Sequence, residues 1–172
     1  PMDTILLPGI HNVEHYMTAI AVTDGLVSDD TIRHVAATFG GVEHRIELVR
    51  IKDGVRFYND SIASSPSRTI AGLRSFSEQV ILIAGGYDKH IPFDVLGPEV
   101  CKHVKRLYLT GATAHKLYDA VASCPDDADG KPEILIIHDF TDTVHAAAAA
   151  AHEGDVVLLS PACAAFDKFK NF

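Results

Sequence analysis

Residues 80–89 read VILIAGGYDK, an apolar run followed by two glycines and a short polar segment. Short apolar runs of this kind form strands inside a parallel sheet, because helices cover both faces of such a sheet. Further runs follow at residues 107–109, 134–137 and 156–159. Segments with helical spacing lie between the runs, at residues 66–76, 95–104, 114–122 and 141–152. The alternation predicts an α/β fold with an open, mostly parallel, Rossmann-like sheet and helical crossovers.

Upstream of this alternation the sequence predicts a hairpin and, before it, two helices. Residues 44–51 and 55–59 are strand-like, and Lys52-Asp53-Gly54 between them is typical of a tight turn. Residues 13–24 and 28–39 carry apolar residues at helical spacing, and Gly40-Gly41 follows them. We therefore expect a helical part, residues 1–40, and an α/β domain, residues 41–172, with about six strands that begin with the hairpin.

The composition is that of an ordinary globular protein. Of 172 residues, 47% are apolar and 22% are charged, which is enough for a substantial core. The formal net charge of −8 argues against a nucleic-acid surface, which would be basic. No apolar run approaches the roughly 18 residues of a membrane span, and no secretory signal is visible. The three cysteines show no close spacing, so we expect a reduced, cytoplasmic setting and no metal site in this chain.

Ligands of open α/β sheets bind beyond the carboxyl ends of the strands, and four segments follow predicted strands in this way. They are NDSIASSP at residues 59–66, GGYDK at 85–89, TGA at 110–112 and SPACAAF at 160–166. In the first segment Asp60 could accept from ribose hydroxyls, next to a helix N-terminus that attracts anions. Simple capping of a turn and a helix by Asp60 and Ser65 explains the same residues equally well.

The second segment combines backbone freedom with a cation. Gly85 and Gly86 would let the backbone approach a ligand closely, and Lys89 would suit a substrate carboxylate. A flexible turn with an exposed lysine is the simpler alternative. Upstream, Arg45 beside His44 suits a phosphate or a carboxylate, or a surface ion pair with a neighbouring glutamate. The patterns G-x-x-x-x-G-K-[ST], H-E-x-x-H and G-x-S-x-G are absent from the sequence, so it carries no signal for a phosphate loop, a zinc-protease helix or a nucleophile elbow, although residue order alone leaves a Ser-His-Asp triad open.

Five segments of the chain occur in one order and spacing: LPGIHN at residues 7–12, GVEHRIE at 41–47, NDS at 59–61, GGYDK at 85–89 and LLSPACA at 158–164. Together they resemble the Mur ligase family of peptidoglycan synthesis, over nearly the whole chain. Each motif alone is weak, but five in series are specific. The NDS and SPAC segments resemble the members of the family that add D-glutamate.

The resemblance implies a three-domain parent with a UDP-sugar domain, a central ATPase domain and a C-terminal Rossmann-like domain. Residues 1–40 would be the tail of the central domain, and residues 41–172 the C-terminal domain, cut before its last helix. The phosphate loop and the Mg²⁺ ligands of the family lie upstream of the matching segment. The resemblance thus implies ATP and Mg²⁺ as cofactors of a monomeric, cytoplasmic parent, and an inactive fragment when this chain is alone.

The same resemblance assigns residues to a nucleotide. Asn12 and His44 would lie near the adenine, and Arg45 and Asp60 near the ribose and phosphates. ATP would phosphorylate the carboxylate of UDP-MurNAc-L-alanine, and the amine of D-glutamate would then attack the acyl phosphate. Catalysis of this kind depends mainly on positioning and on charge stabilisation.

For the amino acid, the resemblance implies that Lys89 acts as the catalytic-site cation that holds a carboxylate of D-glutamate. Ser64 and the backbone near Phe172 would help it. Two positions depart from the family: many relatives carry lysine where this chain has Ile62, and a common serine is Ala165 here. Losing one such hydrogen bond would cost about 1 kcal/mol.

Two alternatives stay open from the sequence. A sister Mur ligase or a folylpolyglutamate synthase would share the fold and the ATP chemistry but use another amino acid or acceptor. A non-catalytic, nucleotide-binding Rossmann-like module would bind ADP without the other domains. A dehydrogenase is disfavoured because no G-x-G-x-x-G follows the first strand.

Overall fold

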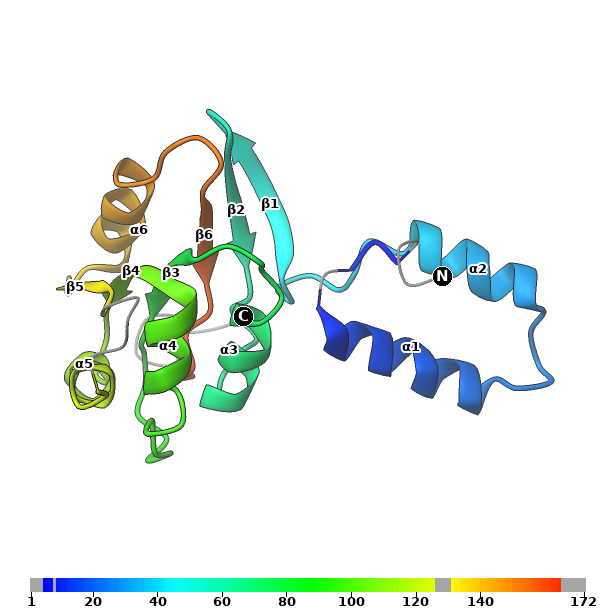
Figure 1. The fold of residues 1–172 in the computed structure, drawn as a ribbon, viewed down its shortest axis with the longest axis horizontal. Coiled ribbons are helices and arrows are strands. Elements are labelled where there is room, and N and C mark those ends of the chain that lie inside the picture. The colour runs from blue at the N-terminus through cyan, green and yellow to red at the C-terminus, as the bar shows by residue number, and fades with distance from the viewer. Residues whose placement is uncertain (1–4, 8, 126–130, 165–172) are drawn as a thin grey trace. The chain divides into compact units, whose positions relative to one another are not determined.

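The computed structural model describes residues 5–7, 9–125 and 131–164 (Figure 1). The chain divides into two compact units, residues 1–43 and residues 44–172. The first unit holds the two predicted helices and the second holds the sheet, and each is described by itself.

The first unit contains α1 (Ile10–Val22) and α2 (Asp29–Thr38). Ser28 caps α2, because its side chain accepts a hydrogen bond from the backbone N–H of Thr31. Of the described residues of this unit, only Asn12 is buried. Large apolar side chains are exposed on both helices and on the turn between them, including Ile10, Met17, Val22, Leu26 and Val35. An apolar surface of this kind usually packs against other protein.

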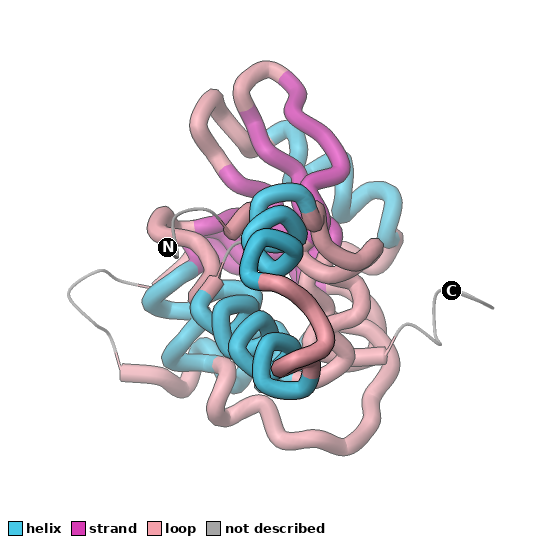
Figure 2. The backbone as a smooth tube through the Cα atoms, turned by 90° about the vertical axis from the view of Figure 1, so that its right-hand side faces the viewer, coloured by secondary structure: helices cyan, strands magenta, loops and turns pink. Residues whose placement is uncertain are grey.

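The second unit is built on a sheet that has six strands within the described residues. They are β1 (Glu47–Lys52), β2 (Val55–Asn59), β3 (Val80–Ala84), β4 (Val104–Leu109), β5 (Glu133–Ile136) and β6 (Val156–Leu159). The strands, magenta in Figure 2, lie in the order β1-β2-β6-β3-β4-β5. Only the β1–β2 hairpin is antiparallel, and the other pairs are parallel. The predicted fold class is confirmed.

Helices cover both faces of the sheet (Figure 1). They are α3 (Pro66–Leu73), α4 (Gly97–His103), α5 (Ala114–Ala122) and α6 (Phe140–Ala149). The first three pack on one face through side chains such as Leu73, Val100 and Leu117, and α6 packs on the other through Ala147. Strand β3 is buried along its whole length, and its residues alternate between the two cores. The continuous apolar run that begins at Val80 is explained by this position, since both of its faces need apolar side chains.

Two predicted boundaries are wrong. Strand β4 begins at Val104, where the sequence predicts the end of a helix, because Lys105 and Arg106 hide the apolar pattern. These two cations lie in the strand and form ion pairs with Asp155 and Glu133. Strand β1 begins at Glu47 instead of His44, because His44 and Ile46 have positive φ angles of 65° and 46°, which no strand allows.

Candidate functional site

The loops that follow β2, β6 and β3 meet at one edge of the sheet. These three strands are neighbours, so their carboxyl ends lie side by side. The N–H of Asp60 donates to Leu159 O (2.8 Å), that of Ser160 to Ile83 O (3.1 Å) and that of Gly85 to Pro161 O (2.9 Å). The N–H of Thr110 likewise donates to Ala84 O (3.0 Å), so the backbone ladder continues into the loops and brings together all four segments that the sequence singles out.

Asp60 is buried at this edge, with 4% of its surface exposed. Its Oδ2 accepts a hydrogen bond from Ser160 Oγ (2.7 Å), and its Oδ1 accepts one from the N–H of Ile46 (3.3 Å). Ser160 Oγ also lies 3.0 Å from Thr69 Oγ1, and both of those residues are fully buried. Asp60 thus joins β2, β6, helix α3 and the segment before β1. The capping alternative, which assigned Asp60 only to a local turn, misses these long-range contacts.

The surroundings of Asp60 change its acidity. Burial raises the pKa of its carboxyl from 3.8 to about 6, because the charged form loses its hydration. The hydrogen bonds from Ser160 and Ile46 oppose this rise, and so do the positive charges of Arg45 and Arg68. Below the raised pKa the folded protein binds a proton that the unfolded chain has already lost.

The free energy of unfolding is therefore expected to fall as the pH rises from about 4 to 6, and to stay low above that pH. A pKa raised from 3.8 to about 6 corresponds to about 3 kcal/mol. Asp60→Asn keeps the acceptor for Ile46 and removes the titration. Urea unfolding at several pH values should show that the free energy of unfolding of the variant exceeds that of the unchanged chain by up to that amount. Asp53→Asn, in the exposed hairpin turn, is the control, and parallel profiles for Asp60→Asn and the unchanged chain would contradict the assignment.

The segment from His44 to Ile46 is a strained loop held against residues 59–62. Left-handed φ angles at non-glycine residues cost on the order of 1–3 kcal/mol each, and isoleucine is among the least tolerant. The carbonyl of His44 accepts from the N–H of Ile62 (3.2 Å), and its ring Nδ1 lies 2.9 Å from Asn59 Nδ2. Glu47, a glutamate neighbouring Arg45 in the chain, accepts from the N–H of His44 (2.8 Å). The loop places the exposed His44 against Asn59 and brings the half-buried Arg45 close enough for its charge to act on Asp60.

Lys89 and Ser64, which the sequence places in one role, lie together. Lys89 Nζ donates to the carbonyl oxygen of Ser64 (3.2 Å) and to its hydroxyl oxygen (3.3 Å). Lys89 is exposed, so its ammonium group is accessible to a ligand. The loop that carries it is anchored by Asp88, which pairs with Lys116 of α5. The position of Ile62, where relatives carry a lysine, is exposed nearby in the chain.

The glycine pair before Lys89 approaches the protein's own loops. A Cβ atom at Gly85 (φ 108°) would lie 2.0 Å from the carbonyl oxygen of Thr110, and one at Gly86 2.5 Å from that of Ala164. The N–H of Gly86 donates to Thr113 Oγ1 (3.0 Å). Neither the ligand approach nor the flexible turn considered from the sequence describes these contacts. The glycines are needed because three loops pack backbone to backbone here.

Gly85→Ala should consequently destabilise the domain by more than about 3 kcal/mol, since a backbone oxygen cannot move out of the way as a side chain can. The midpoint of thermal unfolding measures this. Gly40→Ala is the control, because a Cβ atom there meets nothing within 4 Å. A Gly85→Ala variant as stable as Gly40→Ala would show that the three loops separate easily.

Three further residues that the sequence singles out are not part of the described loops at this edge. Asn12 lies in the first unit, where it is buried in α1 and its Oδ1 is 3.4 Å from His15 Nδ1. Its place beside an adenine stays a prediction. Phe172 and Ala165 lie outside the described residues, so their predicted roles stay predictions too.

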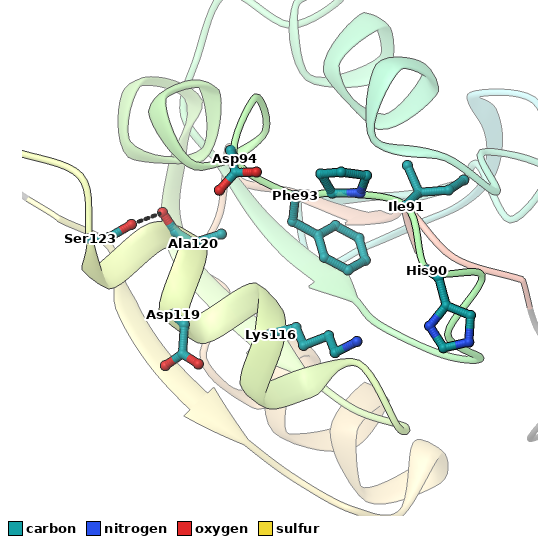
Figure 3. A pocket seen from close by; sticks show the side chains of 9 residues that line it. His90, Ile91, Phe93, Asp94, Lys116, Asp119, Ala120 and Ser123 are labelled. Atoms are coloured by element: carbon teal, nitrogen blue, oxygen red, sulfur yellow. Dashed lines mark hydrogen bonds between the residues drawn. The ribbon is translucent and has the colours of Figure 1, made fainter.

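A pocket of about 500 Å³ lies elsewhere, between residues 90–94 and helix α5 (Figure 3). Lys116, Asp119, Ala120 and Ser123 line its helical side. Figure 3 shows the loop residues, including Phe93 and Asp94, on the opposite side. None of the residues predicted for the site lines this pocket. Its residues carry no motif in the sequence, so no sequence signal could have found it.

Neither a metal cluster nor a membrane helix is found in the described part of the chain. No group of three His, Cys, Asp or Glu side chains there could hold a metal ion. No helix there is long and apolar enough to cross a bilayer.

The fold places this chain in the class of open α/β domains, whose ligands bind beyond the carboxyl ends of the strands. The chain belongs to the Mur ligase family, because residues 44–163 match the model described as the Mur ligase glutamate ligase domain. It is 55% identical over 98% of its length to the UDP-N-acetylmuramoylalanine–D-glutamate ligase of Acetivibrio thermocellus, of which it covers 36%. It is 51% identical over 99% of its length to the enzyme of that name from Clostridium beijerinckii, of which it covers 37%.

The chain thus spans little more than a third of these relatives. Among solved structures, the folylpolyglutamate synthase of Mycobacterium tuberculosis, complexed with ADP and AMPPCP, aligns with a TM-score of 0.64. That alignment covers 92% of this chain and 39% of the other at 14% identity, so it shows the fold alone. The resemblance predicted from the five motifs is confirmed.

Proposed function

We propose that this chain supplies the C-terminal part of a ligase that uses ATP to join D-glutamate to UDP-MurNAc-L-alanine. The observation that carries the proposal is its identity of 51% and 55% to two D-glutamate ligases over almost its whole length. By family resemblance the ligase would be a cytoplasmic monomer. The chain alone would be inactive, since it spans only 36% and 37% of these two relatives.

The reaction has two steps. The carboxylate of UDP-MurNAc-L-alanine attacks the terminal phosphorus of ATP, and ADP leaves. The amine of D-glutamate then attacks the acyl phosphate, and the tetrahedral intermediate expels phosphate and loses a proton as the amide forms. Mg²⁺ would neutralise the phosphate charge, and by family resemblance its ligands belong to the central domain.

The loop of His44 and Arg45 forms the nucleotide side of the proposed site. A guanidinium group forms two-pronged hydrogen bonds with phosphate oxygens, and Arg45 is partly exposed for this contact. Asp60 uses one bond on each oxygen inside the protein. A carboxylate has about four acceptor sites, so a ribose hydroxyl that reached the 4% of Asp60 that is exposed would find a free acceptor site.

Lys89 and Ser64 form the amino-acid side. In the structure the ammonium group of Lys89 has only neutral oxygens of Ser64 among its hydrogen-bond partners within the described residues. A carboxylate of D-glutamate is a stronger partner for a cation than a neutral oxygen. The hydroxyl of Ser64 would remain beside it as a second donor.

Residues 1–40 form, in this proposal, the end of the central ATPase domain. The exposed apolar side chains of α1 and α2, such as Met17 and Val22, support it, because a helix pair with so little buried surface gains stability by packing on further protein.

A domain exchange tests the function. The matching segment of the C. beijerinckii ligase is replaced by this chain, and phosphate release is measured with ATP, UDP-MurNAc-L-alanine and one amino acid at a time. We expect release with D-glutamate and at least about tenfold less with L-glutamate or meso-diaminopimelate. The relative without the segment is the negative control. A folded chimera that releases no phosphate with D-glutamate would favour a nucleotide-binding module. A chimera that prefers another amino acid would favour a sister ligase.

Lys89→Ala in this chimera is expected to raise the KM for D-glutamate by about 30- to 100-fold, because a charge-assisted hydrogen bond is lost. The KM for ATP should change less than about twofold. Lys105→Ala is the matched control, since that lysine pairs with Asp155 near the amino end of β4. Equal increases in both KM values would remove the role assigned to Lys89.

A further inference from the structure

The loop of His44, Arg45 and Ile46 needs an external support. Two of its three residues have left-handed backbones, and Ile46 is the only buried one of the three. The N–H of Ile46 donates to Asp60 Oδ1 across a separation of 14 residues. This bond ties the buried end of the loop to the strand end of β2 and so helps to hold the strained conformation.

Asp60 in turn is held in one orientation. Its Oδ2 faces Ser160 Oγ at 2.7 Å and leaves no room for a Cβ atom at Gly72, which would lie 2.9 Å from that oxygen. A carboxylate that rotated away from Ser160 would lose its charge-assisted bond in a place where water does not replace it. The direction of Oδ1 toward Ile46 therefore depends on the hydroxyl of Ser160.

Thr69 fixes Ser160 from helix α3. Its hydroxyl donates to the carbonyl oxygen of Ser160 (3.4 Å), and its Oγ1 lies 3.0 Å from Ser160 Oγ. Thr69 and Ser160 are both fully buried, so these contacts are shielded from solvent. Thr69 belongs to none of the five family motifs.

We infer that Ser160 and Thr69 are positioning residues for the nucleotide side of the proposed site. They orient Asp60, and Asp60 holds the loop that presents His44 and Arg45. The amino-acid side is supported differently, since the loop of Lys89 is anchored by its glycine pair and by Asp88. Loss of either hydroxyl therefore weakens binding of ATP more than binding of D-glutamate. This kinetic consequence rests on the proposed function, whereas the structural coupling does not.

The coupling is tested on the 172-residue chain by NMR. In Ser160→Ala and in Thr69→Val, amide exchange at Ile46 should rise by about tenfold relative to exchange at Leu82 in the centre of the sheet. The pKa of Asp60, followed by its carboxyl carbon shift, should rise further in Ser160→Ala, because the bond from Ser160 lowers it. The charged groups that face Asp60, Arg45 and Arg68, are unchanged in these variants.

Thr143→Val is the matched control. Thr143 is also fully buried, but its hydroxyl bonds to carbonyls at the start of α6, on the other face of the sheet. In the Thr143→Val variant, the ratio of amide exchange at Ile46 to amide exchange at Leu82 should equal that of the unchanged chain. Thr69→Ser keeps the hydroxyl and should leave the ratio as in the unchanged chain. If Ser160→Ala does not fold, the comparison of Thr69→Val with Thr69→Ser still tests the inference. An unchanged ratio in folded Thr69→Val or Ser160→Ala would overturn the inference.

In the chimera, Thr69→Val is expected to raise the KM for ATP by about five- to tenfold, with the KM for D-glutamate within about twofold. Equal increases would show a general loss of structure and contradict a positioning role. A chimera without D-glutamate activity would refute the proposed function alone, because the exchange and the pKa of Asp60 still report the coupling.

Discussion

The buried carboxylate of Asp60 is the contact on which the ligand-facing edge depends. A charge in this position is costly, which is why its pKa rises toward 6. The cost is offset by bonds to Ser160 and Ile46, and these bonds connect a strand end, a neighbouring loop and a strained segment. An apolar residue of similar size would fill the space but could not orient two polar partners at once. The edge is therefore organised by one desolvated acid.

The parallel sheet explains why this acid can act so widely. Strands β2, β6 and β3 end at the same edge, so segments separated by up to 100 residues become neighbours. The segment from Asp60 to Ser64 then connects the two halves of the proposed site, with the His44 loop at its start and Lys89 at its end. A short stretch after one strand thereby contributes to both the nucleotide side and the amino-acid side.

Much of this arrangement could be predicted from residues alone. The apolar run at residues 80–84 required a strand buried on both faces, and the rule for ligands at strand ends selected Asp60, Lys89 and the loop of Ser160. The prediction failed where charge or backbone geometry overrode the pattern. Lys105 and Arg106 concealed the start of β4, and the positive φ angle of Ile46 shortened β1, because neither ion pairs across strands nor backbone strain has a local signal.

By itself the sequence determined the α/β class, the alternation of strands and helices, and the family, since periodicity and ordered motifs are local properties of the chain. Only the tertiary structure decided what the motif residues touch. It showed Asp60 facing inward, the glycine pair packed on the loops of Thr110 and Ala164, and Thr69 joined to the site without any motif. The physical reason is that these contacts form between distant segments, and their geometry exists only once the sheet has aligned its strand ends.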